Sequence, residues 1–183
     1  FIILPPKYYQ QLEDQLSISE KKMYDLFYNR CPELLLGKFS SEKSNRQLSK
    51  LNIIAQKIET LTSYQRDELH YHKNKEDDWK LLNKITNRAY NNRLFISHLS
   101  NIIYLPKNTH IAFAPEEKMA IINISNSISE IISHGGFKRH KKSASTLKTS
   151  VKRLEEFDQN QMKSHLIYEI LLIYKILDSR YAK

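Results

Sequence analysis

Residues 75–105 carry a stripe of apolar side chains at helical spacing, and this stripe constrains the fold of the whole chain. It consists of Trp79, Leu82, Ile85, Ala89, Ile96, Leu99 and Ile103. Intervals of three, four or seven residues place these side chains on one face of an α-helix. Pro106 predicts the end of the helix, because a proline disfavours helical geometry in the residue before it. At about 1.5 Å per residue the helix would be roughly 45 Å long, which is typical of an elongated bundle.

Composition supports a helical domain with few breaks. The 183 residues include only three glycines and five prolines, and 40% are hydrophobic. So few turn-forming residues argue against a sheet-rich fold and against disorder, and the length suits one domain with a sizeable core. We therefore predict an all-α fold, an elongated bundle of about five mostly antiparallel helices, in a single domain over residues 1–183. Because the chain begins with Phe1 rather than Met, we expect a fragment of a longer polypeptide.

Four further helices are expected in addition to the one at residues 75–105. Apolar spacing and turn residues place them at about residues 6–30, 48–69, 115–133 and 143–179, with a loop at 107–114. Pro32 and Gly37 are residues typical of breaks, and they follow the helix expected at residues 6–30. The apolar stripe of the second is interrupted near residues 63–67. The predicted core comprises Trp79, Leu82, Ile85, Ala89, Ile96, Leu99, Ile122, Leu166 and Ile173.

Basic residues are concentrated in one window of the chain. The 29 lysines and arginines outnumber the 20 acids, and residues 131–154 contain no acid at all. The cations in this window are Lys138, Arg139, Lys141, Lys142, Lys148, Lys152 and Arg153. They would contact anionic lipid headgroups or a nucleic-acid backbone, while a solvated loop between helices explains them equally well. Only Phe137 offers an aromatic ring beside them, so base stacking is not indicated and anionic lipid is preferred over nucleic acid.

No pattern in the sequence defines a metal or cofactor site. His70 and His72 are two residues apart and would point in different directions on a helix. The chain also lacks a glycine-rich loop that would hold phosphates, so we expect no cofactor. Cys31 is the only cysteine, which excludes an internal disulfide and predicts a small apolar core residue.

One motif points to an enzyme. Arg93 and His98, with four residues between them, resemble the Arg and His element of the HEPN ribonucleases, which are also helical bundles. On a helix the two side chains would lie about 140° apart, and a basic chain produces such a pair by chance. A HEPN-like ribonuclease or an RNA-binding helical bundle is therefore the alternative function.

Two segments carry a second resemblance. They are Phe1-Ile2-Ile3-Leu4-Pro5, and Arg88-Ala89-Tyr90-Asn91-Asn92-Arg93-Leu94 followed by a loop with Pro106 and an apolar helix at 120–133. In this order they resemble the cytoplasmic part of the FUSC family, bacterial inner-membrane proteins related to fusaric acid resistance and aromatic acid exporters. The first is similar to the segment that leaves the membrane, and the second to a helix rich in Arg and Ala. Leu105 departs from the pattern, because the family commonly has an acid there.

The resemblance implies a function without catalysis. It implies a cytosolic domain of an efflux-type membrane protein that acts in assembly or regulation, on the cytoplasmic side of the bacterial inner membrane. We expect its partners to be a transmembrane region before Phe1, a second copy of the chain, and anionic lipid. No run of about 18 apolar residues lies within the chain itself.

Overall fold

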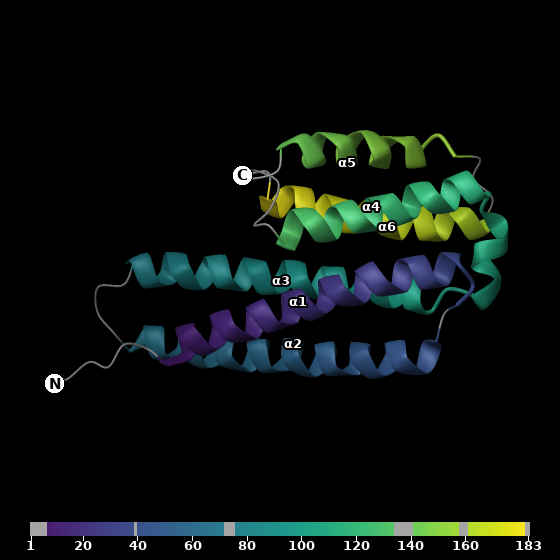
Figure 1. Cartoon of the computed structure of the whole chain (residues 1–183). Helices are drawn as coiled ribbons and strands as arrows, with labels where there is room; N and C mark the ends of the chain where they lie inside the picture. Colours follow the sequence, from purple (N-terminus) through teal and green to yellow (C-terminus); the bar gives the residue numbers. More distant parts are fainter. Residues whose placement is uncertain (1–6, 39, 72–75, 134–140, 158–160, 182–183) are drawn as a thin grey trace.

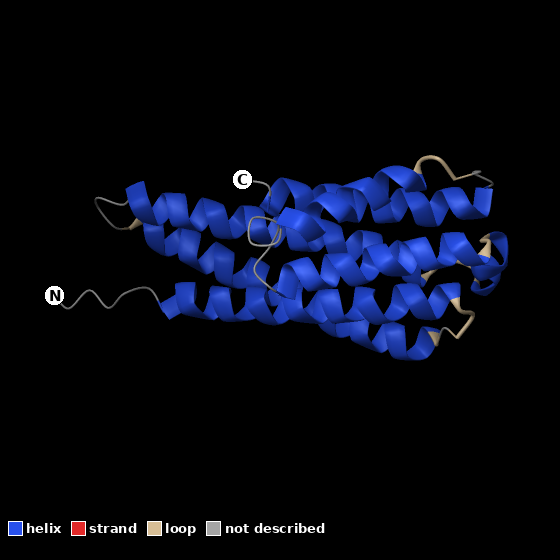
Figure 2. Ribbon diagram, turned by 45° about the horizontal axis from the view of Figure 1, so that its top comes forward, coloured by secondary structure: helices blue, strands red, loops and turns tan. Residues whose placement is uncertain are grey.

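The computed structural model describes residues 7–38, 40–71, 76–133, 141–157 and 161–181, and every regular element that these residues form is a helix (Figure 2). In chain order they are α1 (Lys7–Leu35), α2 (Ser41–His70), α3 (Glu76–Ile103), a short 3-10 helix η1 (Lys107–Ala112), α4 (Pro115–Ser133), α5 (Lys141–Leu154) and α6 (Gln161–Tyr181). The all-α prediction is therefore confirmed for the described residues.

The helices form an elongated bundle of two groups (Figure 1). In the first group, α1, α2 and α3 pack on one another. The second group consists of α4, α5 and α6, and in it α4 packs on α5. Contacts of α1 with α4 and of α3 with α6 join the groups. Successive α-helices run antiparallel, and the first group extends well beyond the second at the end where α2 and α3 meet (Figure 1). The molecule thus has a thick half and a thinner three-helix half.

Helix α3 matches the stretch that the apolar stripe predicted. It spans 28 residues, with the acids Glu76, Asp77 and Asp78 in its first turn. These carboxylates lie where the helix dipole favours negative charge. Leu82, Ile85, Ile96 and Leu99 are all buried, and so are Leu166 and Ile173 of α6. Most of the predicted core is confirmed.

Three of the predicted core residues are only half-buried. Trp79 lies near the α2–α3 end, with its ring centroid 5.3 Å from that of His70. Ala89 lies in the thinner half of the bundle. The buried face of α4 consists of Ile121, Ile124, Ile128 and Ile131. Ile122 follows Ile121 directly, so its side chain lies about 100° further around the helix and is only half-buried. These three assignments to the core are corrected.

The predicted helix over residues 143–179 is two helices. Backbone N–H groups of Glu155 and Glu156 bond to carbonyls three residues back, which tightens the chain and ends α5. Helix α6 then runs back in the opposite direction to α5 and packs on α3. The described residues therefore form six α-helices and one 3-10 helix rather than about five helices.

Other expected breaks are absent or shifted. Helix α1 continues through Pro32 to Leu35. Helix α2 is continuous over residues 63–67, where Gln65 is buried. The loop expected at residues 107–114 contains η1, whose Thr109 bonds to the carbonyl of Pro106 through both its N–H and its hydroxyl. Packing against neighbouring helices keeps these segments helical despite weak local signals.

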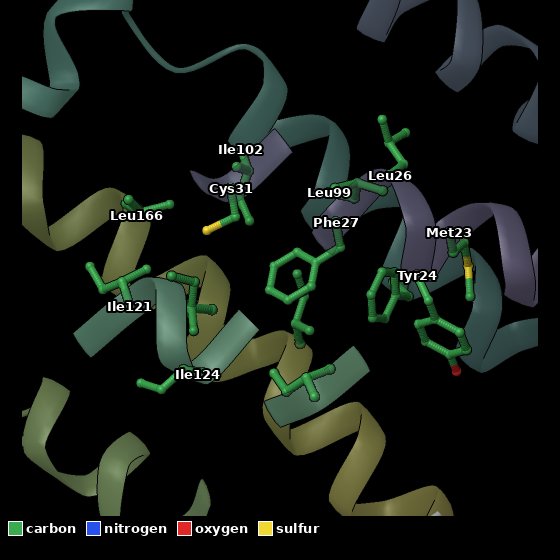
Figure 3. Close-up of a cluster of buried hydrophobic side chains, with 14 of the residues drawn as sticks. Met23, Tyr24, Leu26, Phe27, Cys31, Leu99, Ile102, Ile121, Ile124 and Leu166 are labelled. Atoms are coloured by element: carbon green, nitrogen blue, oxygen red, sulfur yellow. The ribbon is translucent and has the colours of Figure 1, made fainter. Parts of the chain in front are cut away.

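The buried apolar side chains form two clusters. The larger one lies in the thick half and contains residues from every α-helix (Figure 3). At its edge the ring of Phe95 packs edge-to-face against Tyr24 and Phe27, with centroids 5.5 and 5.9 Å away. The smaller one lies in the three-helix half and consists of Leu12, Leu16, Ile58, Leu61 and Ile85. The two clusters are separated along α1, α2 and α3.

A polar network ties α1 to α3 between the clusters. The guanidinium of Arg88 donates two hydrogen bonds to the carboxylate of Glu20, at 2.7 and 2.8 Å, and a third to Glu13 at 2.5 Å. Asn92 donates to Glu20 as well, at 3.1 Å. The side chain of Glu20 is only 12% exposed. The hydrogen bonds to Glu20 raise the pKa of Arg88, so the guanidinium stays charged. This network was not predicted from the sequence, although Arg88 lies three residues from buried Ile85 and hence beside the buried stripe.

A second polar joint holds α6 against the start of α4. The ammonium of Lys163, 8% exposed as a residue, donates to Glu117 at 3.0 Å and lies 5.9 Å from the centre of the Phe113 ring. Burial would raise the pKa of Glu117, but its hydrogen bonds with Lys163 and with the N–H of Ala114 lower it overall. Glu117 therefore caps its own helix and binds the neighbouring one.

We predict that Glu20→Ala lowers the free energy of unfolding by about 1–3 kcal/mol, because partly buried donors on Arg88 and Asn92 lose their acceptor. Chemical denaturation followed by circular dichroism measures the change. The matched control is Glu59→Ala, since Glu59 also pairs with an arginine of α3, Arg93, but both side chains are more than half exposed. Such a pair contributes less than about 1 kcal/mol. Equal losses for the two variants would contradict the structural role of the network.

Gly37 ends α1 in a conformation that disfavours other residues. Its φ is 69°, and the N–H groups of Gly37 and Lys38 bond to the carbonyls of Leu34 and Glu33, the pattern of a Schellman cap. A Cβ here would lie 3.1 Å from the imidazole of His110 in η1. Backbone conformation and close packing thus both require glycine at this position.

We predict that Gly37→Ala costs about 1–2 kcal/mol of stability, because the left-handed conformation is strained for any residue with a Cβ. The same substitution in a His110→Ala background should cost less, since the ring that the Cβ meets is gone. Thermal unfolding of the four proteins in this cycle measures both parts. An unchanged melting temperature in Gly37→Ala would refute the cap.

Candidate anion-binding face

Helix α5 places its apolar residues against the rest of the bundle. Leu147, Val151 and Leu154 are buried, and Ala144 packs beside them at the edge of the larger cluster. Their spacing of three and four residues puts them on one side of the helix, toward α4. The apolar face of α5 is therefore occupied by the core.

The rest of the circumference of α5 presents cations, spread over about 140° between Lys148 and Arg153. Lys148, Lys152 and Arg153 are exposed, and the helix contains no acid. No ion pair joins these three side chains to an acid among the residues that the structure describes. Glu155 and Glu156 follow directly after the helix and are exposed too, so they mark the limit of the cationic surface. We call Lys148, Lys152 and Arg153 the α5 basic face.

The other four residues of the predicted basic patch are placed less fully. Lys141 and Lys142 belong to the first turn of α5, but their side chains lie outside the described part of the structure. Lys138 and Arg139 lie outside the described residues altogether. The exposed residues beside the basic face on α5 include Ser145 and Thr149, which carry hydroxyl groups. No exposed residue of this helix is aromatic. The arrangement can bind an anionic surface through charge.

Arg93 and His98 of the ribonuclease motif do not converge. Arg93 pairs with Glu59 of α2. The Nδ1 of His98 lies 2.7 Å from a carboxylate oxygen of Glu169 in α6, and Asn101 donates to the other oxygen at 3.0 Å. The two residues thus serve different helix contacts, as five helical steps between them imply.

No metal site is found in the part of the chain that the structure describes, where no three His, Cys, Asp or Glu side chains form a group able to hold an ion. Cys31 lies in the larger cluster and is 1% exposed, which confirms its prediction as a core residue. Burial raises the pKa of its thiol to about 12. A thiol that stays protonated is a poor nucleophile and a poor metal ligand.

We predict that Cys31 does not react with Ellman's reagent at pH 8 while the chain is folded, because the thiol is buried and protonated. The released chromophore, followed at 412 nm, should appear only when guanidinium unfolds the chain. The protonated thiol also contributes stability that is complete below the ordinary pKa of about 9 and is lost as the pH rises toward 12. Fast labelling of the native chain would show that this part of the core opens.

Comparison with known proteins finds similar chains in staphylococci. A protein of Staphylococcus epidermidis is 79% identical over 183 residues, which is 100% of this chain and 56% of the relative. A protein of Staphylococcus haemolyticus is 68% identical over 181 residues, 99% of this chain and 55% of the relative. One of Staphylococcus aureus is 56% identical over 182 residues, 100% of this chain and 56% of the relative. These relatives are UPF0421 proteins.

The chain spans slightly more than half the length of these UPF0421 relatives. No family model matches the chain. No solved structure matches it either. Within the described residues, no helix is both long and apolar enough to cross a membrane.

The comparisons correct the family and the function expected from sequence. The chain is similar to UPF0421 proteins and matches no FUSC model, so the resemblance to the FUSC family was wrong. The names of these relatives state neither an efflux function nor a ribonuclease, and the efflux-domain hypothesis and its RNA alternative are both withdrawn. A transmembrane region before Phe1, a cytoplasmic location and self-association stay predictions.

Proposed function

We propose that this chain is a helical module that attaches to the anionic cytoplasmic surface of the bacterial membrane through the α5 basic face. The observation that supports it is a helix with no acid, whose apolar side is buried and whose cations point outward without described ion-pair partners. Anionic lipids give the cytoplasmic leaflet a negative potential that attracts such cations.

The packing of α5 determines the kind of attachment. An amphipathic helix normally enters the headgroup region with its apolar side. In this chain Leu147, Val151 and Leu154 are already buried against the bundle. Binding would therefore be electrostatic, with the helix on the surface rather than inserted into it.

The expected strength is low for one chain. Each Lys or Arg near an anionic surface contributes about 1 kcal/mol, so the three cations of the α5 basic face together contribute about 3 kcal/mol. That energy alone corresponds to a Kd weaker than about 1 mM. If the four further cations of residues 138–142 also reach the surface, the total of about 7 kcal/mol would give a Kd near 10 µM. Binding of this strength would orient the chain on the membrane surface when other contacts already hold the chain there.

A nucleic-acid backbone offers the same negative charge but fits the surface less well. Proteins that bind single strands stack bases on aromatic side chains, and α5 exposes no aromatic residue. Lipid is therefore the occupant that we propose, and duplex DNA serves as the comparison in the test.

The α5 basic face predicts salt-sensitive binding to anionic vesicles. We expect the chain to sediment with vesicles that contain about one-third phosphatidylglycerol and not with phosphatidylcholine alone. Binding should weaken with ionic strength, because exposed charges are screened over about 8 Å at 0.15 M. Lys148→Gln with Lys152→Gln removes about 2 kcal/mol and should weaken binding about thirtyfold.

The control removes the same charge from the opposite side of the bundle. Lys50 and Lys57 are exposed on α2, which lies at the far edge from α5 (Figure 1). Lys50→Gln with Lys57→Gln should leave vesicle binding nearly unchanged. An equal loss in both double variants, or equal binding to neutral vesicles, would contradict the proposal. Loss of DNA binding without loss of vesicle binding in the α5 variant would assign the face to nucleic acid instead.

A further inference from the structure

The three-helix half of the bundle has a much smaller core than the thick half. Its cluster takes side chains from α1, α2 and α3 alone, whereas the larger cluster takes them from every α-helix. In the described part of the chain, α4, α5 and α6 do not extend over this half (Figure 1). Leu69 and Leu82 are buried near the α2–α3 end, but they belong to neither cluster. Since apolar burial is the main favourable term in folding, the three-helix half is held less strongly than the thick half.

The core of the three-helix half also contains a buried amide without hydrogen bonds. Gln65 of α2 is 0% exposed, and neither its side-chain nitrogen nor its side-chain oxygen has a partner among the described residues. It lies between Leu61 and Leu69 on the buried face of α2. Water can bond to this amide only when the surrounding side chains separate. Burial of Gln65 therefore favours an open state of this half.

The two halves meet at a level of small side chains. Ser19, Ala55 and Ala89 line a cavity of about 200 Å³ there. Ala55 packs against the larger cluster and Ala89 against the smaller one. At the same level the hydrogen bonds of Arg88 with Glu20 hold α1 to α3. Because small side chains make few apolar contacts across this level, loss of the smaller cluster would leave the larger one largely intact.

Contacts among the three helices make this half a single unit. The hydroxyl of Tyr9 in α1 donates a hydrogen bond to the carbonyl of Asp78 in α3 at 2.9 Å. The ring centroid of Tyr8 lies 6.1 Å from that of Tyr64 in α2. Each helix therefore packs on the other two at this end. The three segments should lose their packing together rather than one by one, because an isolated helix end gains little stability from its own backbone.

We infer that the three-helix half opens as one unit while the thick half stays folded, with the level of Ser19, Ala55 and Ala89 as the limit of the opening. Regions that open below global unfolding have few buried apolar contacts, as this half has. The open state uncovers the apolar side chains of the smaller cluster and the amide of Gln65, which are buried in the closed bundle. This conformational device is independent of the α5 basic face.

The test is native-state hydrogen exchange of the whole chain, followed by NMR at guanidinium concentrations below the unfolding transition. Amides of residues 12–16, 60–68 and 81–86 should exchange through one shared opening. Their protection should be about tenfold or more below that of residues 97–102 and 121–128. The shared opening should depend less on denaturant than global unfolding, because it exposes less surface. Equal protection in both halves, or a separate opening for each segment, would overturn the inference.

A matched pair of substitutions distinguishes this opening from global unfolding. Ile85 and Ile124 are each 1% exposed, one in the smaller and one in the larger cluster. Ile85→Val should lower the protection of the three-helix half about fivefold, the usual effect of one lost methylene. Ile124→Val should lower the protection of the thick half about fivefold.

Ile124→Val should leave the protection of the three-helix half unchanged, because the thick half is folded in both the closed and the open state. Equal effects of the two variants on the three-helix half would show that the chain unfolds only as a whole. That result would overturn the inference.

Gln65→Met tests the contribution of the buried amide. Met is also unbranched and flexible, and it carries no amide that needs hydrogen bonds. Protection of the three-helix half should rise about tenfold, because closing no longer buries an unsatisfied amide. Unchanged or lower protection would contradict the role of Gln65 in the opening.

Discussion

Burial of α3 on two sides is the constraint on which the rest of the structure depends. One part of its surface packs against α1 and α2, and another packs against α6. The side chains of Phe95, Leu99 and Ile102 are thereby at most 1% exposed, and they belong to the cluster that contains residues from every α-helix. Fully burying an apolar side chain of this size contributes about 1.5–3 kcal/mol. The contact of α1 with α4 is the second join between the two helix groups.

Polar side chains specify how the helices meet. Arg88 and Glu20 join α3 to α1, Glu117 and Lys163 join α4 to α6, and His98 joins α3 to Glu169 of α6. Partly buried charges of this kind are costly unless they are paired, so they disfavour other registers of the same helices more than they add stability. The lysines and arginine of the α5 basic face have no such partner among the described residues, which is why that surface is the candidate for an external anion.

Two parts of the molecule depart from ideal packing in different ways. On α5 the apolar side chains are buried against the bundle, and the cations on the rest of the helix have no acid on the same helix to pair with. Between α1, α2 and α3 the core is incompletely filled, because the small side chains of Ala55, Ala89 and Ser19 line the same hollow. The staphylococcal UPF0421 relatives are longer than this chain.

Much of the fold could be predicted from local pattern. Helix α3, the burial of Leu82, Leu99, Leu166 and Ile173, and the role of Cys31 follow from spacing and composition, since these depend on which residues share a helix face. The acid-free basic window was visible in the sequence as well, but only packing determined that Lys148, Lys152 and Arg153 face outward.

What the sequence by itself determined is that the chain is helical, with few breaks and with a basic segment near its end. Tertiary structure decided the remainder: the turn that separates α5 from α6, the continuation of α1 through Pro32, the Arg88 network and the cavity beside Ser19. The Arg88 network and the cavity depend on residues from different helices meeting at one level of the bundle. Spacing along one helix carries no information on that alignment, because it is set by the joint packing of side chains that lie far apart in the chain.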